Sequence, residues 1–223
     1  MSNLILIIGD PIESSDDTQW EWGELTADGR ELSQMGVAHT PEEKQALADH
    51  GFTHIRMIIP GSAVRIKHNA LGALSEKQVR QAAGFSVEDE LAAPLSQTHL
   101  SFSDKADRLA ITSIDYMDQF LEECASYGLS PDVVNADYDA LPEAGYYEFH
   151  DRIIYSVGDN SEGLETGWAL EKDTALHVLG DDPISPLYLS GPAFLQKIVS
   201  AHTQYHMPIN LRQGGYAKTN PLS

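Results

Sequence analysis

The order of strand and helix patterns in the first 60 residues constrains the fold of this chain more than any other feature. Four strand-like segments are separated by turn residues and by one helical pattern. These segments cover residues 4–8, 19–25, 31–39 and 53–59. The helical pattern lies between the third and the fourth. We therefore expect the chain to begin with three strands, a helix and a fourth strand of an α/β fold.

The helix in this opening has clear end signals. Thr40 is the expected N-cap, Pro41 stands at the first helical position, and Glu43 completes a capping box. Gly51 is expected to close the far end of the helix, because glycine is the usual residue just past a helix C-terminus.

The pattern then restarts in a second, smaller module. We expect a strand at 63–66, a helix after Ser75, and two strands at 98–102 and 108–114. The helix that closes this module presents apolar side chains on one face and ends at Gly128. These side chains are Tyr116, Met117, Phe120, Leu121, Cys124 and Tyr127. We expect that face to be part of the core.

Shorter patterns follow in the second half of the chain. The expected elements are strands at 146–149, 152–157, 168–170 and 186–190, a short helix near 174–179 and a helix opened by Pro192. Residues 210–223 are rich in Gly, Asn and Lys and have no periodicity, so we interpret them as a tail or linker.

The charge of the chain excludes several classes of function. Its 223 residues carry a formal net charge of -20, which repels a nucleic-acid backbone and an anionic membrane surface. Cys124 is the single cysteine, so no intramolecular disulfide can form. The chain has no signal-peptide pattern and no apolar run of the roughly 20 residues that a membrane-spanning helix needs. We expect a soluble domain in the cytoplasm.

Reactive residues are present, but their patterns favour structural roles. Cys124 lies on the apolar face of its helix, as a packed thiol does. His202 and His206 have the spacing of a metal pair, yet no third ligand stands nearby and Pro208 is expected to end the helix. We predict no catalytic, cofactor-binding or metal-binding residues.

Three acidic clusters are also interpreted as surface features without a catalytic or metal-binding role. They are Asp16-Asp17, Glu88-Asp89-Glu90 and Asp181-Asp182. In a chain with 34 acidic residues such runs arise by composition and usually form solvated faces.

Nucleotide binding is the strongest alternative, because actin-like ATPases and sugar kinases open with the same element order. Those proteins hold phosphate in a glycine-bearing turn after the first strand, where backbone amides must approach closely. Here Asp10 ends the strand, Pro11 follows, and the loop to Thr18 carries four acids. A second expected contact, the turn at 187–192, has Pro192 in place of a second glycine. An ATP- or metal-dependent enzyme using Asp10 and a second acid such as Glu21 stays open as the alternative.

Four segments, in order and spacing, resemble the protein L family of type II secretion systems (GspL). They are Ile-Ile-Pro-Gly-Ser-Ala-Val at 58–64, the core of the helix at 81–91, Ala-Ser-Tyr-Gly-Leu-Ser-Pro-Asp at 125–132, and Ile-Asn-Leu-Arg-Gln-Gly-Gly-Tyr-Ala at 209–217. Each motif alone is weak, but their order and spacing support a resemblance that extends over nearly the whole chain.

The resemblance implies a mixed α/β fold of actin-like, RNase H-like subdomains with a small inserted α+β module. The implied divisions are 1–60 for the first subdomain, 61–129 for the inserted module, 130–209 for the second subdomain, and 210–223 for a juxtamembrane tail that precedes a membrane helix. It further implies a non-catalytic scaffold at the cytoplasmic face of the inner membrane. Family members bind the N-terminal domain of the secretion ATPase, protein E, together with membrane proteins M and F. A homodimer is an open alternative.

One stretch of the sequence is a candidate contact for such a partner. Five of the 14 basic residues gather in it, and complementary charge steers association. They are Arg56, Arg65, Lys67, Lys77 and Arg80. Pairing with nearby acids is the ordinary alternative. If the contact lies elsewhere, we expect it in the acidic stretch 143–182 or at an exposed strand edge of the inserted module.

Overall fold

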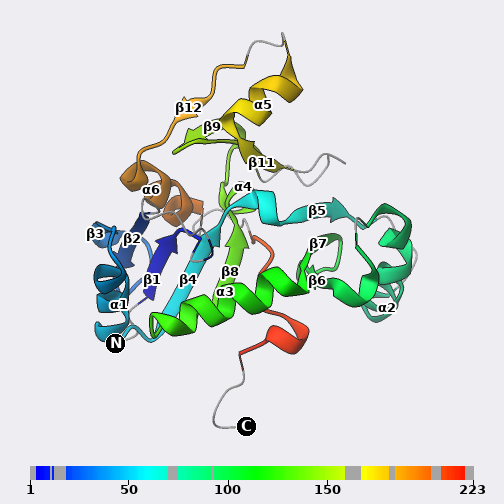
Figure 1. Ribbon diagram of the computed structural model, residues 1–223, viewed down its shortest axis with the longest axis horizontal. Helices are drawn as coiled ribbons and strands as arrows, with labels where there is room; N and C mark the ends of the chain where they lie inside the picture. The colour runs from blue at the N-terminus through cyan, green and yellow to red at the C-terminus, as the bar shows by residue number, and fades with distance from the viewer. Residues whose placement is uncertain are drawn as a thin grey trace.

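The computed structural model describes residues 4–10, 12, 19–69, 75–91, 93–158, 167–180, 184–201 and 207–218. Three β-sheets with flanking helices make up this part of the chain (Figure 1). We call them sheets A, B and C. Sheets B and C extend from sheet A in two different directions, and α3 (Ile114–Ser126) runs along sheet A toward sheet B.

Sheet A is a five-stranded mixed sheet. Its strands, in spatial order, are β3 (Leu32–Ala38), β2 (Trp20–Leu25), β1 (Leu4–Ile8), β4 (His54–Ile59) and β8 (Val133–Ala136). β2 is antiparallel to both of its neighbours, whereas β1, β4 and β8 run parallel to one another. The predicted opening of three strands, a helix and a fourth strand is therefore confirmed.

Sheet B is smaller and antiparallel. Its order is β5 (Arg65–His68), β7 (Arg108–Ser113) and β6 (Thr98–Phe102). The helix α2 (Glu76–Val87) covers one face, where its Ala83 and Val87 pack with Leu109 and Ile111 in a separate small core.

Sheet C is built from the second half of the chain. Its order is β11 (Trp168–Glu171), β10 (Arg152–Val157), β9 (Ala144–Phe149) and β12 (Leu187–Tyr188), with β12 parallel to β9. Two further helices, α5 (Lys172–Leu179) and α6 (Gly191–Ala201), follow β11 and β12 along the chain.

The main core joins sheets A and C. On one face of sheet A, the predicted stripe of α3 is buried, and the Cys124 thiol lies 3.5 Å from the sulfur of Met57. Elsewhere in the same core, α6 meets sheet C where the rings of Phe149 and Phe194 are 4.6 Å apart. Because one apolar cluster spans both sheets, these sheets form one packed unit.

The capping signals in the sequence are confirmed. Glu43 N–H donates to the Thr40 hydroxyl at 3.2 Å, and the Glu43 carboxylate accepts from Thr40 N–H at 3.1 Å, so α1 (Pro41–Asp49) begins with a complete capping box. Gly51 follows this helix with φ of 68°, a backbone conformation that glycine adopts without strain.

The strand predicted at 63–66 was placed too early. Residues Gly61–Ala63 form a 3-10 turn that Val64 N–H closes on the Gly61 carbonyl, so β5 begins only at Arg65. The turn is fixed at Gly61, where an added Cβ would lie 2.2 Å from the Tyr138 ring.

The C-terminal segment is packed rather than free. Ile209 and Leu211 are buried, and Leu211 N–H donates to the Val134 carbonyl along the outer edge of β8. Gln213 donates to the Phe102 carbonyl and so ties the segment to sheet B as well. Residues 210–218 of the segment that we interpret as a tail or linker are therefore held against two sheets by backbone and side-chain hydrogen bonds.

Sheet membership also crosses one of the expected divisions. β8 follows residue 130, yet it completes sheet A beside β4. The division into independent units at 1–60, 61–129, 130–209 and 210–223 stays a prediction. In the described part of the chain, none of the helices is long and apolar enough to cross a membrane.

Candidate interaction surfaces and the polar junction of the sheets

The five predicted contact residues do not form one continuous strip. Arg56 lies inside the protein with 6% of its surface exposed, and its Nε donates to Asn135 Oδ1 at 2.7 Å. Burial lowers the pKa of the Arg56 guanidinium to about 10. The expectation that Arg56 contacts a partner needs correction, since its position on β4 points it into the structure.

Arg65 and Lys67 do lie together on β5, and both pair with one acid. Glu90 accepts from Arg65 Nη2 at 3.1 Å and from Lys67 Nζ at 2.5 Å. The hydrogen bond and charge of Lys67, followed by the charge of Arg65, lower the pKa of the Glu90 carboxyl. The charge of these two cations is thus partly offset within the chain.

The remaining two residues of the predicted contact lie on α2. Lys77 is exposed to solvent, whereas Arg80 is half-buried. The Arg80 guanidinium lies 4.9 Å from the centroid of the Phe102 ring, and its Nη2 donates to the Ser103 carbonyl at 3.4 Å. The inserted module therefore presents a mixed surface in which Arg65, Lys67 and Lys77 reach solvent.

The two acids of the enzyme alternative are both buried near the ends of strands in sheet A. Asp10 accepts from Ile12 N–H and from the Tyr116 hydroxyl, each at 2.9 Å. Glu21 accepts from Gln19 Nε2 at 3.0 Å, and the nearest ring nitrogen of His150 is 4.0 Å away. Burial raises the pKa of both carboxyls, so each one favours the proton more than a solvated acid does.

Glu21 occupies the place where the nucleotide alternative requires an open glycine turn. A Cβ added to Gly191, the first residue of α6, would lie 2.0 Å from the Glu21 carboxyl carbon. The carboxylate therefore fills the space against the N-terminus of α6, where an anion would otherwise be favoured. A phosphate group would meet a negative charge at this point.

Other reactive groups have structural surroundings. Burial raises the pKa of the Cys124 thiol far above its usual range, which makes it a poor nucleophile. Across the described ranges, no cluster of three or more His, Cys, Asp or Glu side chains has the arrangement of a metal site. The pairs Asp16-Asp17, Asp181-Asp182 and His202 with His206 lie outside those ranges.

Sequence reasoning missed the short helix α4 (Asp137–Ala140), which links all three sheets. Asp137 is fully buried, and its Oδ1 accepts from Gly61 N–H at 2.9 Å and from Tyr138 N–H at 2.7 Å. Its other oxygen faces Arg152 of sheet C, whose Nη2 is 3.6 Å away. Burial raises the pKa of Asp137 to about 6, although the charge of Arg152 opposes this shift.

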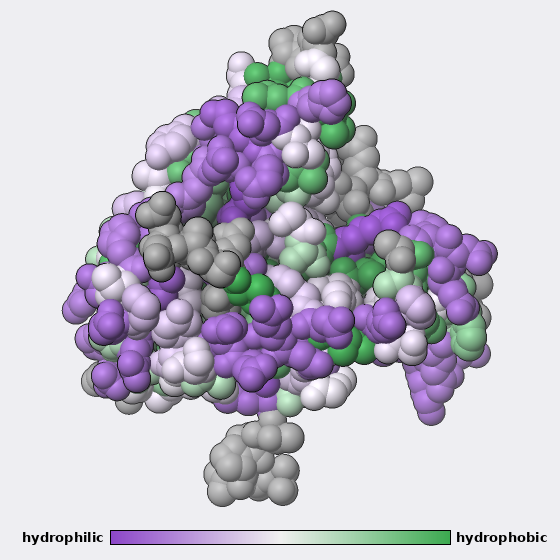
Figure 2. All heavy atoms as spheres, in the orientation of Figure 1, coloured by the Kyte–Doolittle hydropathy of each residue, from purple (hydrophilic) through white to green (hydrophobic). Residues whose placement is uncertain are grey.

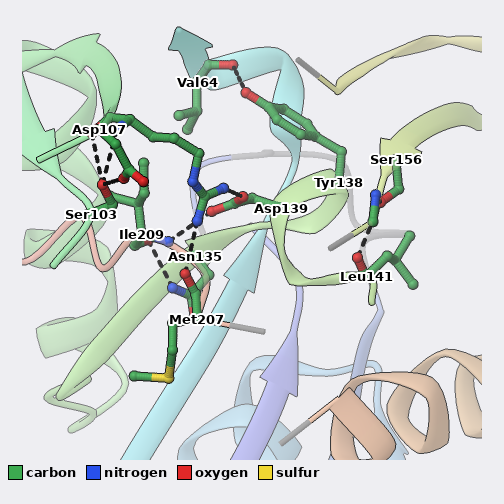
Figure 3. Close-up of polar contacts among 12 residues, drawn as sticks. Val64, Ser103, Asp107, Asn135, Tyr138, Asp139, Leu141, Ser156, Met207 and Ile209 are labelled. Carbon is green, nitrogen blue, oxygen red and sulfur yellow. Dashed lines mark hydrogen bonds and ion pairs between the residues drawn. The ribbon is translucent and has the colours of Figure 1, made fainter. Parts of the chain in front are cut away.

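Asp139, two residues further along, makes the corresponding link to sheet B (Figure 3). Arg108 of β7 donates to its Oδ1 at 2.5 Å, and Ile209 N–H donates to its Oδ2 at 2.7 Å. Arg108 also donates to the Met207 carbonyl at 2.9 Å. Between the two acids, the Tyr138 hydroxyl donates to the Val64 carbonyl.

A groove of about 340 Å³ lies beside this junction. Its lining combines apolar side chains such as Val133, Phe102 and Met207 with the buried pair Arg56 and Asn135. Asn135 donates to the Ile209 carbonyl at 2.8 Å, so the polar lining is already engaged in holding the C-terminal segment (Figure 3).

One family model and two related proteins carry the same description. Residues 6–148 match the family model of type II secretion system (T2SS), protein L. A type II secretion system protein L of Dickeya chrysanthemi is 25% identical over 231 residues, which cover 97% of this chain and 57% of that protein. The corresponding protein of Pectobacterium carotovorum subsp. carotovorum is 25% identical over 142 residues, covering 62% of this chain and 33% of that protein. The match thus spans little more than half of the Dickeya protein and a third of the Pectobacterium protein.

A solved structure has the same fold. The cytoplasmic domain of EpsL, an inner membrane component of the type II secretion system of Vibrio cholerae, matches 96% of this chain and 100% of its own with a TM-score of 0.68 at 14% sequence identity. Together with the strands and helices of the three sheets, this confirms the predicted mixed α/β fold class. The actin-like type and the inserted module stay predictions.

Proposed function

Because the chain belongs to the protein L family of type II secretion systems, we propose that it is a non-catalytic scaffold that recruits the secretion ATPase, protein E, to the inner-membrane platform. In this proposal the domain lies at the cytoplasmic face of the inner membrane, as part of a longer single-pass protein. Proteins M and F are its other partners there.

The observation that best supports a scaffold over an enzyme is the position of Glu21. Its carboxylate lies against Gly191 at the start of α6, in the turn that the nucleotide alternative would use as its second contact. Asp10, the other acid of the enzyme alternative, is engaged by Tyr116 and by the backbone of residue 12. In the described residues, both acids of this site are therefore already hydrogen-bonded within the chain.

A thermal-shift measurement with Mg-ATP or Mn²⁺ separates the two functions. A ligand that binds the folded protein raises its melting temperature by mass action, by several degrees once its concentration is about 100 times its Kd. The scaffold proposal expects no shift at millimolar Mg-ATP. A clear shift that Asp10→Asn abolishes would instead support the enzyme alternative.

The exposed part of the basic stretch is our proposed electrostatic contact for the ATPase domain. Arg65 and Lys67 share Glu90, so Glu90→Gln should release both cations and strengthen binding about twofold to fivefold. Reversal of Arg65, Lys67 and Arg80 to Glu should weaken binding about tenfold or more, mainly through the association rate. Both effects are measured by titration with the N-terminal domain of the ATPase.

A matched control keeps the charge change but moves its position. Lys105→Glu alters one exposed lysine in the turn between β6 and β7 of the same module and should leave the affinity unchanged. If Lys105→Glu weakens binding as much as each reversal on β5 does, net charge and not this surface determines the affinity. Unchanged affinity in the triple variant would place the contact elsewhere.

A further inference from the structure

The two faces of sheet C differ in what covers them. Tyr147, Phe149 and Ile154 point toward sheet A and α6 and belong to the main core. On the opposite face α5 packs over β10 and β11, where Ile153 is fully buried. Successive side chains of a strand alternate between faces, so Tyr146, Glu148 and Tyr155 lie on this second, outer face.

Three aromatic rings form a compact cluster on the outer face. Tyr146, Tyr155 and Trp168 are in register on β9, β10 and β11. The ring centroids of Tyr146 and Tyr155 are 4.8 Å apart, and that of Trp168 lies 5.9 Å from Tyr155 and 6.1 Å from Tyr146. All three side chains are half-buried, and none belongs to the described core clusters or to the side chains packed against them. Part of the aromatic surface of this cluster is therefore exposed to solvent.

The edge strand β12 extends this apolar surface. Leu187 and Tyr188 are 55% and 67% exposed. Tyr188 is in register with Glu148 and lies on the outer face, whereas Leu187 is in register with Tyr147 and lies on the opposite face. Leu189 N–H donates to the Glu148 carbonyl, so the N–H and carbonyl of the preceding Tyr188 point away from β9. These groups lie at the open edge of sheet C.

Exposed apolar side chains gather in this part of the molecule. Eight large ones are exposed in the described residues, and four of them belong to α5 and β12. The four are Leu176, Val178, Leu187 and Tyr188. Figure 2 shows hydrophobic atoms at the end of the molecule where Figure 1 places α5. Apolar surface concentrated in this way marks an interaction site more often than scattered exposed residues do.

The charges around the three rings indicate which kind of partner this surface would bind. Lys172 pairs with Glu148 at 2.7 Å, and the carboxylates of Asp151 and Asp173 also act on it and help to raise its pKa. Three acids thus surround one lysine. The faces of aromatic rings attract cations, and a second copy of a chain with net charge -20 would bring more negative charge. Both facts favour a basic partner.

We propose that the outer face of sheet C docks an extended, basic segment of a partner protein. An arginine or lysine of that segment lies over the rings of Tyr146, Tyr155 and Trp168. Its apolar neighbours contact the exposed ring of Tyr188, and its backbone pairs with the outward groups of Tyr188. This proposal does not depend on the recruitment of the ATPase. We placed the ATPase contact on the basic surface of Arg65 and Lys67, which would attract acids of a partner.

The test uses the full chain and a synthetic peptide of alternating arginine and valine, six residues long and blocked at both ends. A matched peptide replaces arginine with glutamate. The three tryptophans give three indole N–H signals in an NMR spectrum, and Trp168→Phe identifies the reporter. We expect the basic peptide to shift the Trp168 signal saturably, with a Kd of about 1 mM or below. No saturable shift, or an equal shift by the acidic peptide, would overturn the proposal.

Variants locate the binding surface. Tyr146→Leu should weaken binding about tenfold, and Tyr188→Ser about threefold, because both remove aromatic contact area. Tyr188 is mostly exposed, so its variant decides the matter if Tyr146→Leu does not fold. Met35→Ala, on the exposed edge strand β3 of sheet A, is the control and should leave binding unchanged.

Sedimentation of the protein without peptide tests the competing occupant. The proposal expects no self-association through this surface. If the protein dimerises and Tyr188→Ser makes it monomeric, the outer face of sheet C binds a second copy of the chain and the proposal is wrong.

Discussion

Sheets B and C are attached to sheet A by two acids of the same short helix, yet the two attachments differ. Asp139 accepts from Arg108 and Ile209 with one oxygen each, so both of its oxygens are hydrogen-bonded. Asp137 holds two backbone amides with one oxygen only, and Arg152 lies 3.6 Å from the other. The Oδ2 of Asp137 and the Nε of Arg152 are buried without a hydrogen-bond partner in the described structure. We call the link to sheet B, in which both carboxylate oxygens of Asp139 are hydrogen-bonded, the saturated link. The link to sheet C, in which one oxygen of Asp137 has no hydrogen bond, is the unsaturated link.

This difference predicts how rigidly each of the two sheets is held against sheet A. A saturated buried ion pair fixes geometry, because removal of either partner leaves an uncompensated charge. An acid whose pKa lies near 6 can lose its charge under mild conditions, which weakens its pull on the facing arginine. We expect sheet B to be held rigidly on sheet A and sheet C to be held mainly by the apolar core.

The largest expected effect comes from cutting the saturated link. Arg108→Met removes the cation that is hydrogen-bonded to Asp139, whose side chain is 5% exposed, and should lower the free energy of unfolding by about 3 to 5 kcal/mol. Arg152→Met should cost less, about 1 to 2 kcal/mol, because its contact with Asp137 lacks a hydrogen bond. Urea unfolding at pH 7 measures both. Equal losses would remove the distinction between the two links.

The pH dependence of the free energy of unfolding reports on the carboxyl of Asp137, in the unsaturated link. Burial raises the pKa of Asp137 from 3.8 to about 6, so the folded state binds the proton more tightly than the unfolded state. The stabilising contribution of the protonated form is complete below pH 4 and is lost as the pH rises to about 6. Its full size is about 3 kcal/mol.

Asp137→Asn tests this directly, because the amide stays neutral. Relative to the original protein, the variant should gain up to about 3 kcal/mol of stability between pH 4 and pH 7. Urea unfolding of both proteins across this range measures the change, and Asp115→Asn, on the surface of α3, is the control. A stability difference that does not change with pH would contradict the raised pKa.

The smallest expected effect belongs to the surface of sheet B. Arg65→Met breaks an ion pair whose side chains are 56% and 45% exposed, and should change the free energy of unfolding by less than about 1 kcal/mol. Thermal or urea unfolding at low and high salt checks it. A loss as large as that of Arg108→Met would mean that exposed pairs contribute to holding the inserted module.

The sequence predicted those parts of the fold that depend on local chemistry. The capping box at Thr40, the stop at Gly51 and the apolar stripe of α3 involve residues close in the chain, and all are confirmed. The pairing of Arg65 and Lys67 with Glu90 is the ordinary alternative that the charge pattern left open.

The candidate sites were harder to predict because they depend on distant contacts. Asp137 receives the backbone of Gly61 from 76 positions earlier, and no local pattern marks it. The rings of Tyr146, Tyr155 and Trp168 meet only when three strands align, although each strand was expected. Arg56 looked like part of a surface cluster because sequence proximity to other cations says nothing about the direction of a side chain on a strand.

The central claim is that this domain binds a protein and not a nucleotide. One titration tests it most directly: the full chain against the N-terminal domain of the cognate secretion ATPase, with Mg-ATP as a parallel ligand. We expect saturable binding of the ATPase domain, with a Kd of about 1 μM or below, and no response to Mg-ATP. A response to Mg-ATP without binding of the ATPase domain would contradict this claim.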